Sequence, residues 1–301
     1  MAHGSRPFIQ VTRMAQADLA NDGVATCPVI DCDAIAEIFA ELTLEAAVAV
    51  MGVYATDPHA RRKADRSFVC DADERAEAII LAGLAIRVPG IPVIAEEAAS
   101  RGEKPRCGRA FILVDPVDGT REFLHRNGEF TINIALILDG VPRAGAVYAP
   151  AIGQLWMAGT CAYACPVEPG APLPPLAQRR VISVRANPRQ GLTALASRSH
   201  ADAETEVFLA RLPIAERRSA GSSLKFCTIA EGAADVYPRF GPTMEWDTAA
   251  GDAVLRAAGG AVLDEVGTAL LYGKAQNQYR NGPFVAWGDP AAVAQPRGMR
   301  G

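Results

Sequence analysis

A short apolar run that ends in two aspartates is the feature that most constrains how this chain folds. Residues 111–114 (Phe-Ile-Leu-Val) have the continuous apolar pattern of a buried strand. The strand is expected to stop at Asp115-Pro116, because proline cannot donate to the ladder and the chain must turn. Asp118-Gly119-Thr120 then opens a segment with free backbone N–H groups. Two carboxylates at one rigid corner suit Mg²⁺ or Mn²⁺, and the exposed N–H groups suit a phosphate.

Charge and cysteine usage narrow the class of protein. A formal net charge of −4 over 301 residues provides no basic surface for nucleic acid, and 50% hydrophobic residues are ample for a core. The seven cysteines are irregularly spaced and lack zinc-site partners, which predicts reduced thiols in a cytoplasm rather than a disulfide framework. No signal-peptide core and no apolar run of transmembrane length is present in the sequence. A cytoplasmic protein is expected, with peripheral association at the inner membrane left open.

Two helices and a strand are expected before the central motif. Helical periodicity runs from Asp33 to about residue 54, with an alanine-rich, buried second part. Residues 56–67 are polar and basic, as in a loop. A second helix begins at Asp71, carries acids in its first turn where the helix dipole favours them, and ends before residue 89. Residues 91–95 are predicted to form a strand that delivers Glu96-Glu97 at its end.

The rest of the chain divides at a proline-rich seam, residues 166–175. Before the seam, strands at 130–138 and 145–148 are joined by the hairpin signal Asp139-Gly140, and a further strand is expected at 154–158. After it we expect strands at 181–184, 193–197, 235–237 and 260–264 and helices at 203–212, 223–231 and 248–258. We therefore predict a loose extension (1–30), an α+β metal-binding half (31–165) and an α/β substrate half that completes the site (178–290), with sheets sandwiched between helices.

Three groups of residues together resemble the inositol monophosphatase superfamily of lithium-sensitive, magnesium-dependent phosphatases. They are Glu96-Glu97, the run Asp115-Pro-Val-Asp118-Gly-Thr120, and the run Trp246-Asp247-Thr-Ala-Ala-Gly251. Segments 126–131, 197–202, 221–227 and 237–242 resemble the CysQ-type branch of that superfamily, the bacterial 3′(2′),5′-bisphosphate nucleotidases. The likeness extends from about residue 33 to about residue 285, and the ordered set is more specific than any single motif.

The resemblance implies a fold, a reaction and a partner. The fold class is α+β / α/β, as a layered α-β-α-β-α sandwich of the sugar/inositol phosphatase type. The reaction is hydrolysis of 3′-phosphoadenosine 5′-phosphate to AMP, in support of sulfate assimilation. The partner is therefore a small phosphorylated nucleotide rather than a nucleic acid, and the chain would be a monomer or a homodimer.

The resemblance also implies two or three Mg²⁺ ions, for which Mn²⁺ can substitute. Glu96, Asp115 and the backbone carbonyl of Val117 match the ligands of one ion. The ligands of a second ion are matched by Asp115, Asp118 and Asp247. Asp73 matches an acid that binds a third ion or positions water. Two ions roughly 3.5–4 Å apart clamp the attacking and leaving oxygens of an in-line displacement, which explains why such acids cluster.

Further positions match catalytic and substrate-binding residues of the family. The implied catalytic residues are Thr120, Asp73 and Glu96. The N–H groups of Gly119 and Thr120 would hold phosphate oxygens where a helix begins. The positions that match contacts to the nucleotide and its second phosphate are His200, Ser222, Lys225, Arg239 and Asp247.

Each of these residues has a simpler structural interpretation when it is taken alone. Asp247 could be a helix N-cap, Glu96-Glu97 a solvated loop end, and Lys225 and Arg239 ordinary surface charges.

Cys70 replaces the threonine that the family usually has before Asp73, and a thiol bonds more weakly than a hydroxyl. Two other functions stay open, of which only the second is suggested by Cys70. One is hydrolysis of inositol monophosphate or fructose 1,6-bisphosphate. The other is a weakly active, metal-dependent nucleotide-binding regulator.

Overall fold

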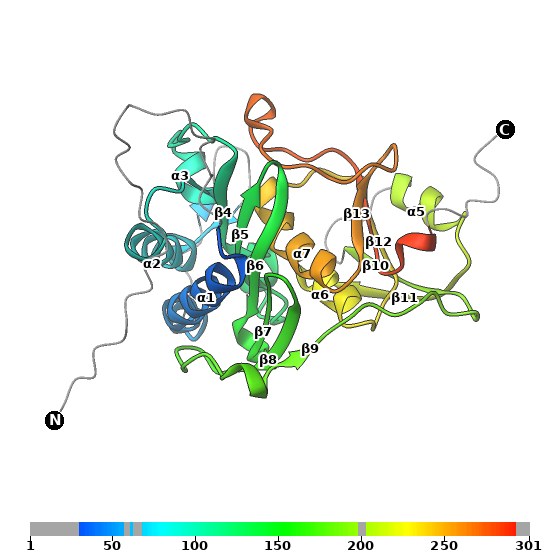
Figure 1. Ribbon diagram of the computed structural model, residues 1–301, viewed down its shortest axis with the longest axis horizontal. Helices are drawn as coiled ribbons and strands as arrows, with labels where there is room; N and C mark the ends of the chain where they lie inside the picture. The colour runs from blue at the N-terminus through cyan, green and yellow to red at the C-terminus, as the bar shows by residue number, and fades with distance from the viewer. Residues whose placement is uncertain (1–29, 57–60, 63–67, 198–202, 293–301) are drawn as a thin grey trace, which may run out of the picture.

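Two β-sheets, separated and flanked by helices, make up the fold. A computed structural model describes residues 30–56, 61–62, 68–197 and 203–292 (Figure 1). Helices α1 (Cys32–Tyr54) and α2 (Asp71–Arg87) cover one face of a seven-stranded sheet. Helices α6 (Leu224–Ala230) and α7 (Glu245–Ala257) lie between this sheet and a five-stranded sheet, and α5 (Ala203–Leu209) packs on the outer face of the latter. The predicted layered α-β-α-β-α sandwich is confirmed.

The seven-stranded sheet starts with one parallel pair and continues antiparallel. Its strands, in spatial order, are β3 (Val93–Ala95), β4 (Ala110–Asp118), β5 (Thr131–Leu138), β6 (Val141–Ala149), β7 (Gln154–Ala158), β8 (Ala162–Pro166) and β9 (Arg180–Val181). Along β4, Ile112 and Val114 join the core under α1 and α2, whereas Phe111 and Leu113 join the core under α7. Because both faces of the sheet are covered, the strand is apolar at successive positions.

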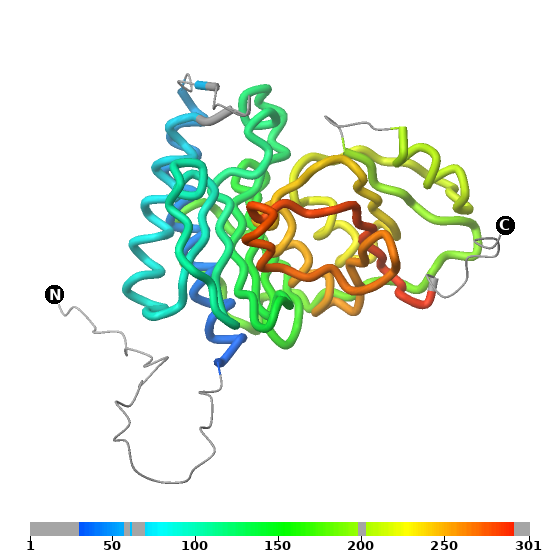
Figure 2. Tube along the Cα trace, turned by 90° about the horizontal axis from the view of Figure 1, so that it is seen from above, coloured from blue at the N-terminus to red at the C-terminus, as the bar shows by residue number. Residues whose placement is uncertain are grey.

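The five-stranded sheet contains three adjacent parallel strands. The spatial order is β11 (Ile214–Ala220), β10 (Leu192–Ser197), β12 (Val236–Arg239), β14 (Phe284–Trp287) and β13 (Ala261–Asp264). Strands β10, β11 and β12 run parallel, so their last residues, Ser197, Ala220 and Arg239, lie at one edge. Seen from above, this sheet and the N-terminal helices lie on opposite sides of the molecule (Figure 2).

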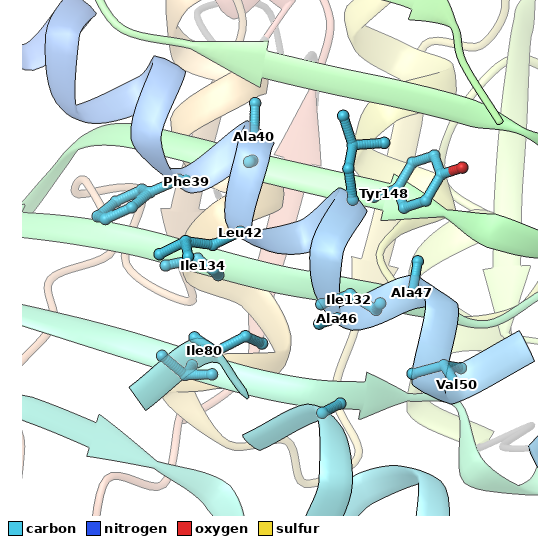
Figure 3. Close-up of a cluster of buried hydrophobic side chains, with 14 of the residues drawn as sticks. Phe39, Ala40, Leu42, Ala46, Ala47, Val50, Ile80, Ile132, Ile134 and Tyr148 are labelled. Carbon is cyan, nitrogen blue, oxygen red and sulfur yellow. The ribbon is translucent and has the colours of Figure 1, made fainter. Parts of the chain in front are cut away.

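Large apolar side chains fill the space between α1 and the seven-stranded sheet. Phe39, Leu42 and Val50 of α1 are fully buried and face Ile134 and Tyr148 of the sheet (Figure 3). Burial of each such side chain contributes roughly 1.5–3 kcal/mol. The helix begins where the side chain of residue 31 accepts the N–H groups of residues 33 and 34, at 3.1 and 3.0 Å. The sequence pattern of this helix is thus explained by one buried face and one cap.

Helix α7 packs closely on the seven-stranded sheet although the two are distant in sequence. A Cβ added to Gly145 of β6 would lie 2.9 Å from the Cβ of Ala253 and 3.0 Å from the carbonyl oxygen of Ala250. Any larger residue at this position would push the helix away from the sheet. The close contact brings the N-terminus of α7 toward the end of β4, and residues of both sheets share one core.

Several predicted boundaries are wrong. Strand β4 does not stop at Asp115-Pro116 but continues to Asp118, because the chain stays extended past an irregular register at the proline. Helix α5 ends at Leu209 rather than at residue 212, and α7 begins three residues before the predicted position. The strand expected at 181–184 is reduced to β9, which pairs with β8.

Three strands of the two large sheets and a short ladder were not predicted from the sequence. One of the three is β8, which pairs with β7. β11 is mostly exposed and polar at the edge of its sheet, so it lacks an apolar run, and β14 was not recognised. Within the predicted loop 56–67, β1 (Arg61–Arg62) pairs with β2 (Phe68–Val69), while residues 57–60 and 63–67 lie outside the described residues.

The remaining connections include short 3-10 helices, at Pro150–Ile152, Leu176–Gln178, Ala275–Asn277 and Pro290–Ala292. Residues 1–29, most of the predicted N-terminal extension, also lie outside the described part. Among the helices of the described residues, none combines the length and the apolar character needed to cross a membrane.

Candidate active site

Two aspartates lie at the end of β4, where the chain turns into α4 (Thr120–Leu124). Asp115 is 1% exposed, and its Oδ1 accepts the N–H of Val117 at 3.1 Å. Gly119 makes the turn with φ of 90°, a conformation that residues with side chains rarely adopt. Thr120 then donates its hydroxyl to the Val117 carbonyl at 3.4 Å. One short segment thus places two carboxylates, a carbonyl and a hydroxyl together.

Glu96 reaches the same region from the neighbouring strand. β3 pairs with β4 in parallel, with Ala95 opposite Val114, so the next residues, Glu96 and Asp115, are neighbours. Glu96 is also the first residue of α3 (Glu96–Ser100) and is half-buried. The alternative of a solvated loop end is wrong for Glu97, which is 3% exposed.

The first turns of α2 and α7 supply Asp73 and Asp247. Asp73 accepts the backbone N–H of Cys70 at 2.9 Å and its thiol at 3.0 Å. Asp247 is the third residue of α7 and accepts the N–H of Met244, the N-cap residue, at 2.8 Å, so the simpler interpretation of Asp247 as the N-cap is wrong. Burial and the neighbouring carboxylate raise the pKa of the Cys70 thiol to about 12, so the thiol keeps the proton that it donates. Cysteine therefore supplies the hydrogen bond for which threonine was expected.

Electrostatic repulsion shows that these acids converge. Burial raises the pKa of Asp115 well above its ordinary value, and the charges of Glu96, Asp118, Asp247 and Asp73 raise it further. The pKa of Asp247 is raised by burial and then by Asp118 and Glu96. The structure thus brings together all five carboxylates that the sequence selected, from α2, α3, β4 and α7. Their repulsion is the energy that a bound divalent cation would remove.

A loop before α6 holds Asp118 from the other half of the molecule. Asp118 Oδ2 accepts the hydroxyls of Ser222 at 2.7 Å and Ser223 at 3.0 Å. Ser223 is 1% exposed and accepts the amide N–H of Asn133 at 2.8 Å. Its single hydroxyl proton is shared between Asp118 and the carbonyl of Asp247, which lies 3.1 Å away. Burial raises the pKa of Asp118, and the two serine hydroxyls partly oppose that rise. This loop therefore connects the acids of β4 and α7.

Lys225 and Arg239 are interior cations, so the alternative of ordinary surface charges is wrong. They are 4% and 6% exposed. Lys225 Nζ donates to the carbonyls of Ser222 at 2.6 Å and Ala220 at 3.2 Å and lies 5.0 Å from the ring centre of Tyr237. Burial lowers the pKa of this lysine to about 8, although the charge of Asp118 opposes the change.

Arg239 is held by its own loop. It donates to the carbonyls of Gly241 at 3.2 Å and Pro242 at 3.1 Å. Its charge lowers the pKa of Asp247, so the guanidinium acts on the acidic cluster. The buried cations Lys225 and Arg239 thus act on two acids of the site, Asp118 and Asp247.

The donor chemistry fits a hard divalent cation. Carboxylate and carbonyl oxygens are the ligands that Mg²⁺ prefers in proteins. As the side chains stand, no three carboxylates, imidazoles or thiols among the described residues are close enough to hold one ion between them. The hydrogen bonds to Asp115, Asp118 and Asp247 each engage one carboxylate oxygen. The other oxygen of each acid remains a candidate ligand.

The residues that hold the acids in place were not predicted from the sequence. Asn133 and Glu77 carry no motif. Ser223 lies in segment 221–227, which resembles the CysQ branch, but a serine before an apolar helix suggests only a cap. The available signal for Glu77 was its spacing of four residues from Asp73, since this spacing places both acids on one face of α2. His200, a predicted nucleotide contact, lies outside the described residues.

Comparison with known proteins decides the family. The sequence model of the inositol monophosphatase family matches residues 31–292. The chain belongs to the inositol monophosphatase family. The family resemblance and the expectation of a phosphatase are thereby confirmed, and this family is Mg²⁺-dependent in general.

Relatives within the inositol monophosphatase family cover most of the chain. The "3′(2′),5′-bisphosphate nucleotidase CysQ" proteins of Shigella flexneri and Escherichia coli strain K12 are each 46% identical over 234 residues, 77% of this chain and 91% of the relative. The crystal structure of CysQ from Bacteroides thetaiotaomicron has a TM-score of 0.70 and 37% identity, covering 86% of this chain and 97% of that one. An IMPase of Thermotoga maritima, at 21% identity with a TM-score of 0.66 (84% and 92% covered), shares the fold.

Proposed function

We propose that this family member is a Mg²⁺-dependent phosphomonoesterase that removes the 3′-phosphate of 3′-phosphoadenosine 5′-phosphate to give AMP, in support of sulfate assimilation. The observation that carries the proposal is the convergence of five carboxylates from four elements beside two buried cations. Relatives that are named bisphosphate nucleotidases, at 46% identity over most of the chain, support the choice of substrate.

Two groups of oxygen ligands would hold the ions. Glu96, Asp115 and the Val117 carbonyl form one group, and Asp115 with Asp118 and Asp247 forms the other. Asp73 is the candidate for a third ion. When bound, Mg²⁺ supplies Lewis-acid stabilisation of the charge that develops on the transferring phosphoryl group.

The chain's own polar groups around β4 would bind and orient the reactants. The Thr120 hydroxyl, which now bonds the Val117 carbonyl, would hold the attacking water together with Asp73. The N–H groups of Gly119 and Thr120 would donate to oxygens of the scissile phosphate, because the first N–H groups of a helix have no internal acceptor. Glu96, beside Asp115, completes the proposed catalytic set.

The nucleotide would lie over the carboxyl ends of the parallel strands, where open α/β sheets bind their ligands. Ser222 lies in the loop after β11, Lys225 in the first turn of α6 that follows this loop, and Arg239 at the end of β12. We assign these residues, with His200 and Asp247, to the nucleoside and its 5′-phosphate. Both cations are buried, so each would act on that phosphate through a small rearrangement of the loop carbonyls that it now binds.

Several finer assignments belong to the same proposal. We propose two Mg²⁺ ions and a third at Asp73, replaceable by Mn²⁺, and sensitivity of the activity to lithium. The protein would act in the cytoplasm, with peripheral inner-membrane association as an alternative, as a monomer or a homodimer. The chain would divide into an extension of residues 1–30, a metal-binding half of residues 31–165 and a substrate half of residues 178–290.

Phosphate release from a panel of substrates tests the function. The panel contains 3′-phosphoadenosine 5′-phosphate, inositol monophosphate and fructose 1,6-bisphosphate, each with Mg²⁺ and with excess EDTA. We expect kcat/KM for the nucleotide to exceed the others by at least tenfold and to vanish in EDTA. A preference for either of the other substrates would overturn the nucleotidase assignment. Equal rates in EDTA would overturn the role of the metal.

A further inference from the structure

The start of helix α3 is held by a side chain from another helix. Ala95 occupies the N-cap position and has no side chain that could accept a hydrogen bond from the helix. The N–H groups of Glu97 and Ala98 instead donate to the two carboxylate oxygens of Glu77, at 2.7 and 2.9 Å. Glu77 thus performs from α2 the function that serine or aspartate usually performs at an N-cap.

Glu77 is deeply buried, and its surroundings compensate its charge. Glu77 is 2% exposed, and burial raises its pKa above the ordinary value, although the two N–H groups and Arg101 oppose part of that rise. Arg101 Nη2 lies 3.2 Å from Glu77 Oε1, but the arginine side chain is half exposed. A carboxylate at a helix N-terminus is also favoured by the helix dipole. The N–H groups of α3 and Arg101 therefore both offset part of the cost of burying this carboxylate.

The same contact sets the place of Glu96. Glu96 is the first residue of α3, directly before the two N–H groups that Glu77 binds. On its other side, the pairing of Ala95 with Val114 fixes the chain. Glu77 also lies one turn after Asp73 on α2, so the helix that carries one acid of the site fixes the position of another.

We propose that Glu77 is a positioning residue that orients Glu96 toward Asp115 and thereby sets the affinity of the site for its divalent ion. This inference rests on the proposed ion-binding role of Glu96. Partners that fix a metal ligand from behind typically change metal affinity 10–100-fold when they are replaced.

Binding of Mn²⁺ to the full chain, followed by the electron paramagnetic resonance signal of the free ion, tests the proposal without using activity. Glu77→Gln keeps the shape but offers one oxygen where two N–H groups need two acceptors. Glu77→Ala removes both acceptors. Arg101→Ala is the matched control, because it removes the surface ion pair and leaves the contact to α3. Glu96→Gln shows what loss of the ligand itself does.

We expect both Glu77 variants to bind Mn²⁺ at least tenfold more weakly, and Arg101→Ala to stay within twofold of the wild type. A merely structural role would instead lower the unfolding temperature in EDTA and leave the affinity unchanged. If Glu96→Gln weakens binding and Glu77→Gln does not, the inference is overturned and the proposed function stands. If Glu96→Gln binds Mn²⁺ normally, the proposed metal site fails and the inference with it. If Glu77→Ala does not fold, the Glu77→Gln result decides.

Discussion

Replacing Ser223 by alanine should cost this protein more stability than removal of one hydroxyl suggests. The hydroxyl shares its one proton between Asp118 and the Asp247 carbonyl, and it accepts the amide N–H of Asn133. A hydrogen bond to a charged group contributes about 1.5–3 kcal/mol, and a buried donor left without an acceptor costs about 1–3 kcal/mol. Asn133 Oδ1 already has no partner among the described residues, so the variant would leave the whole buried amide without one there.

The expected total is roughly 2–4 kcal/mol, because Asp118 keeps its second bond to Ser222. At about 2–4 °C per kcal/mol for a chain of this size, the unfolding temperature should fall by about 4–16 °C. Turnover should fall as well, since Ser223 links the acids of β4 and α7.

Thermal unfolding in EDTA, followed by circular dichroism, measures the effect in Ser223→Ala, Asn133→Val and the double variant. In the double variant both polar partners are replaced by apolar groups, so neither leaves the other without a hydrogen-bond partner. Its loss in free energy of unfolding should therefore be smaller than the sum of the two single losses, by at least about 1 kcal/mol. Thr228→Val is the control, because its hydroxyl donates to a carbonyl of its own helix, that of Leu224, at 2.7 Å. Additive costs, or a Ser223→Ala loss no larger than the control's, would refute the proposed link.

Two further predictions concern buried charges. Asp115→Asn should leave less than about a tenth of the Mg²⁺-dependent phosphate release. It should nevertheless raise the unfolding temperature in EDTA at pH 7, because burial and four neighbouring acids oppose the Asp115 charge; normal turnover or a lower unfolding temperature would contradict this. The pKa of Lys225 falls from 10.5 to about 8 on folding. Between these two pH values the unfolded chain therefore holds the Lys225 proton more tightly than the folded chain does. The free energy of unfolding of the wild type, relative to Lys225→Met, should therefore rise between pH 8 and 10, and a pH-independent difference would show that the lysine is not desolvated.

Local pattern was sufficient to predict much of the fold. The apolar run before Asp115 marked β4, the hairpin signal at Asp139-Gly140 joined β5 to β6, and helical periodicity predicted α1 and α2. These elements bury most of their apolar side chains, so their sequences show the period of the structure. β11 was missed for the complementary reason: an exposed edge strand needs no apolar alternation.

Sequence by itself selected the acids of the site. A single carboxylate after a buried strand or at the start of a helix can be structural, but several in this order along the chain are hard to explain by coincidence. Sequence alone was therefore sufficient to choose Glu96, Asp115, Asp118 and Asp247. The resemblance carried by the same residues predicted the family, which the comparisons confirm.

Only the tertiary structure decided what holds those acids and where the cations lie. Ser223 and Asn133 are 90 residues apart and Glu77 acts on α3 across 20 residues, and no local pattern encodes contacts between distant segments. Lys225 is charged and carries no apolar signal, yet packing of the loop before α6 buries it. Desolvation and hydrogen bonding depend on what surrounds a group in space, so burial, pKa and partners become defined only when the chain has folded.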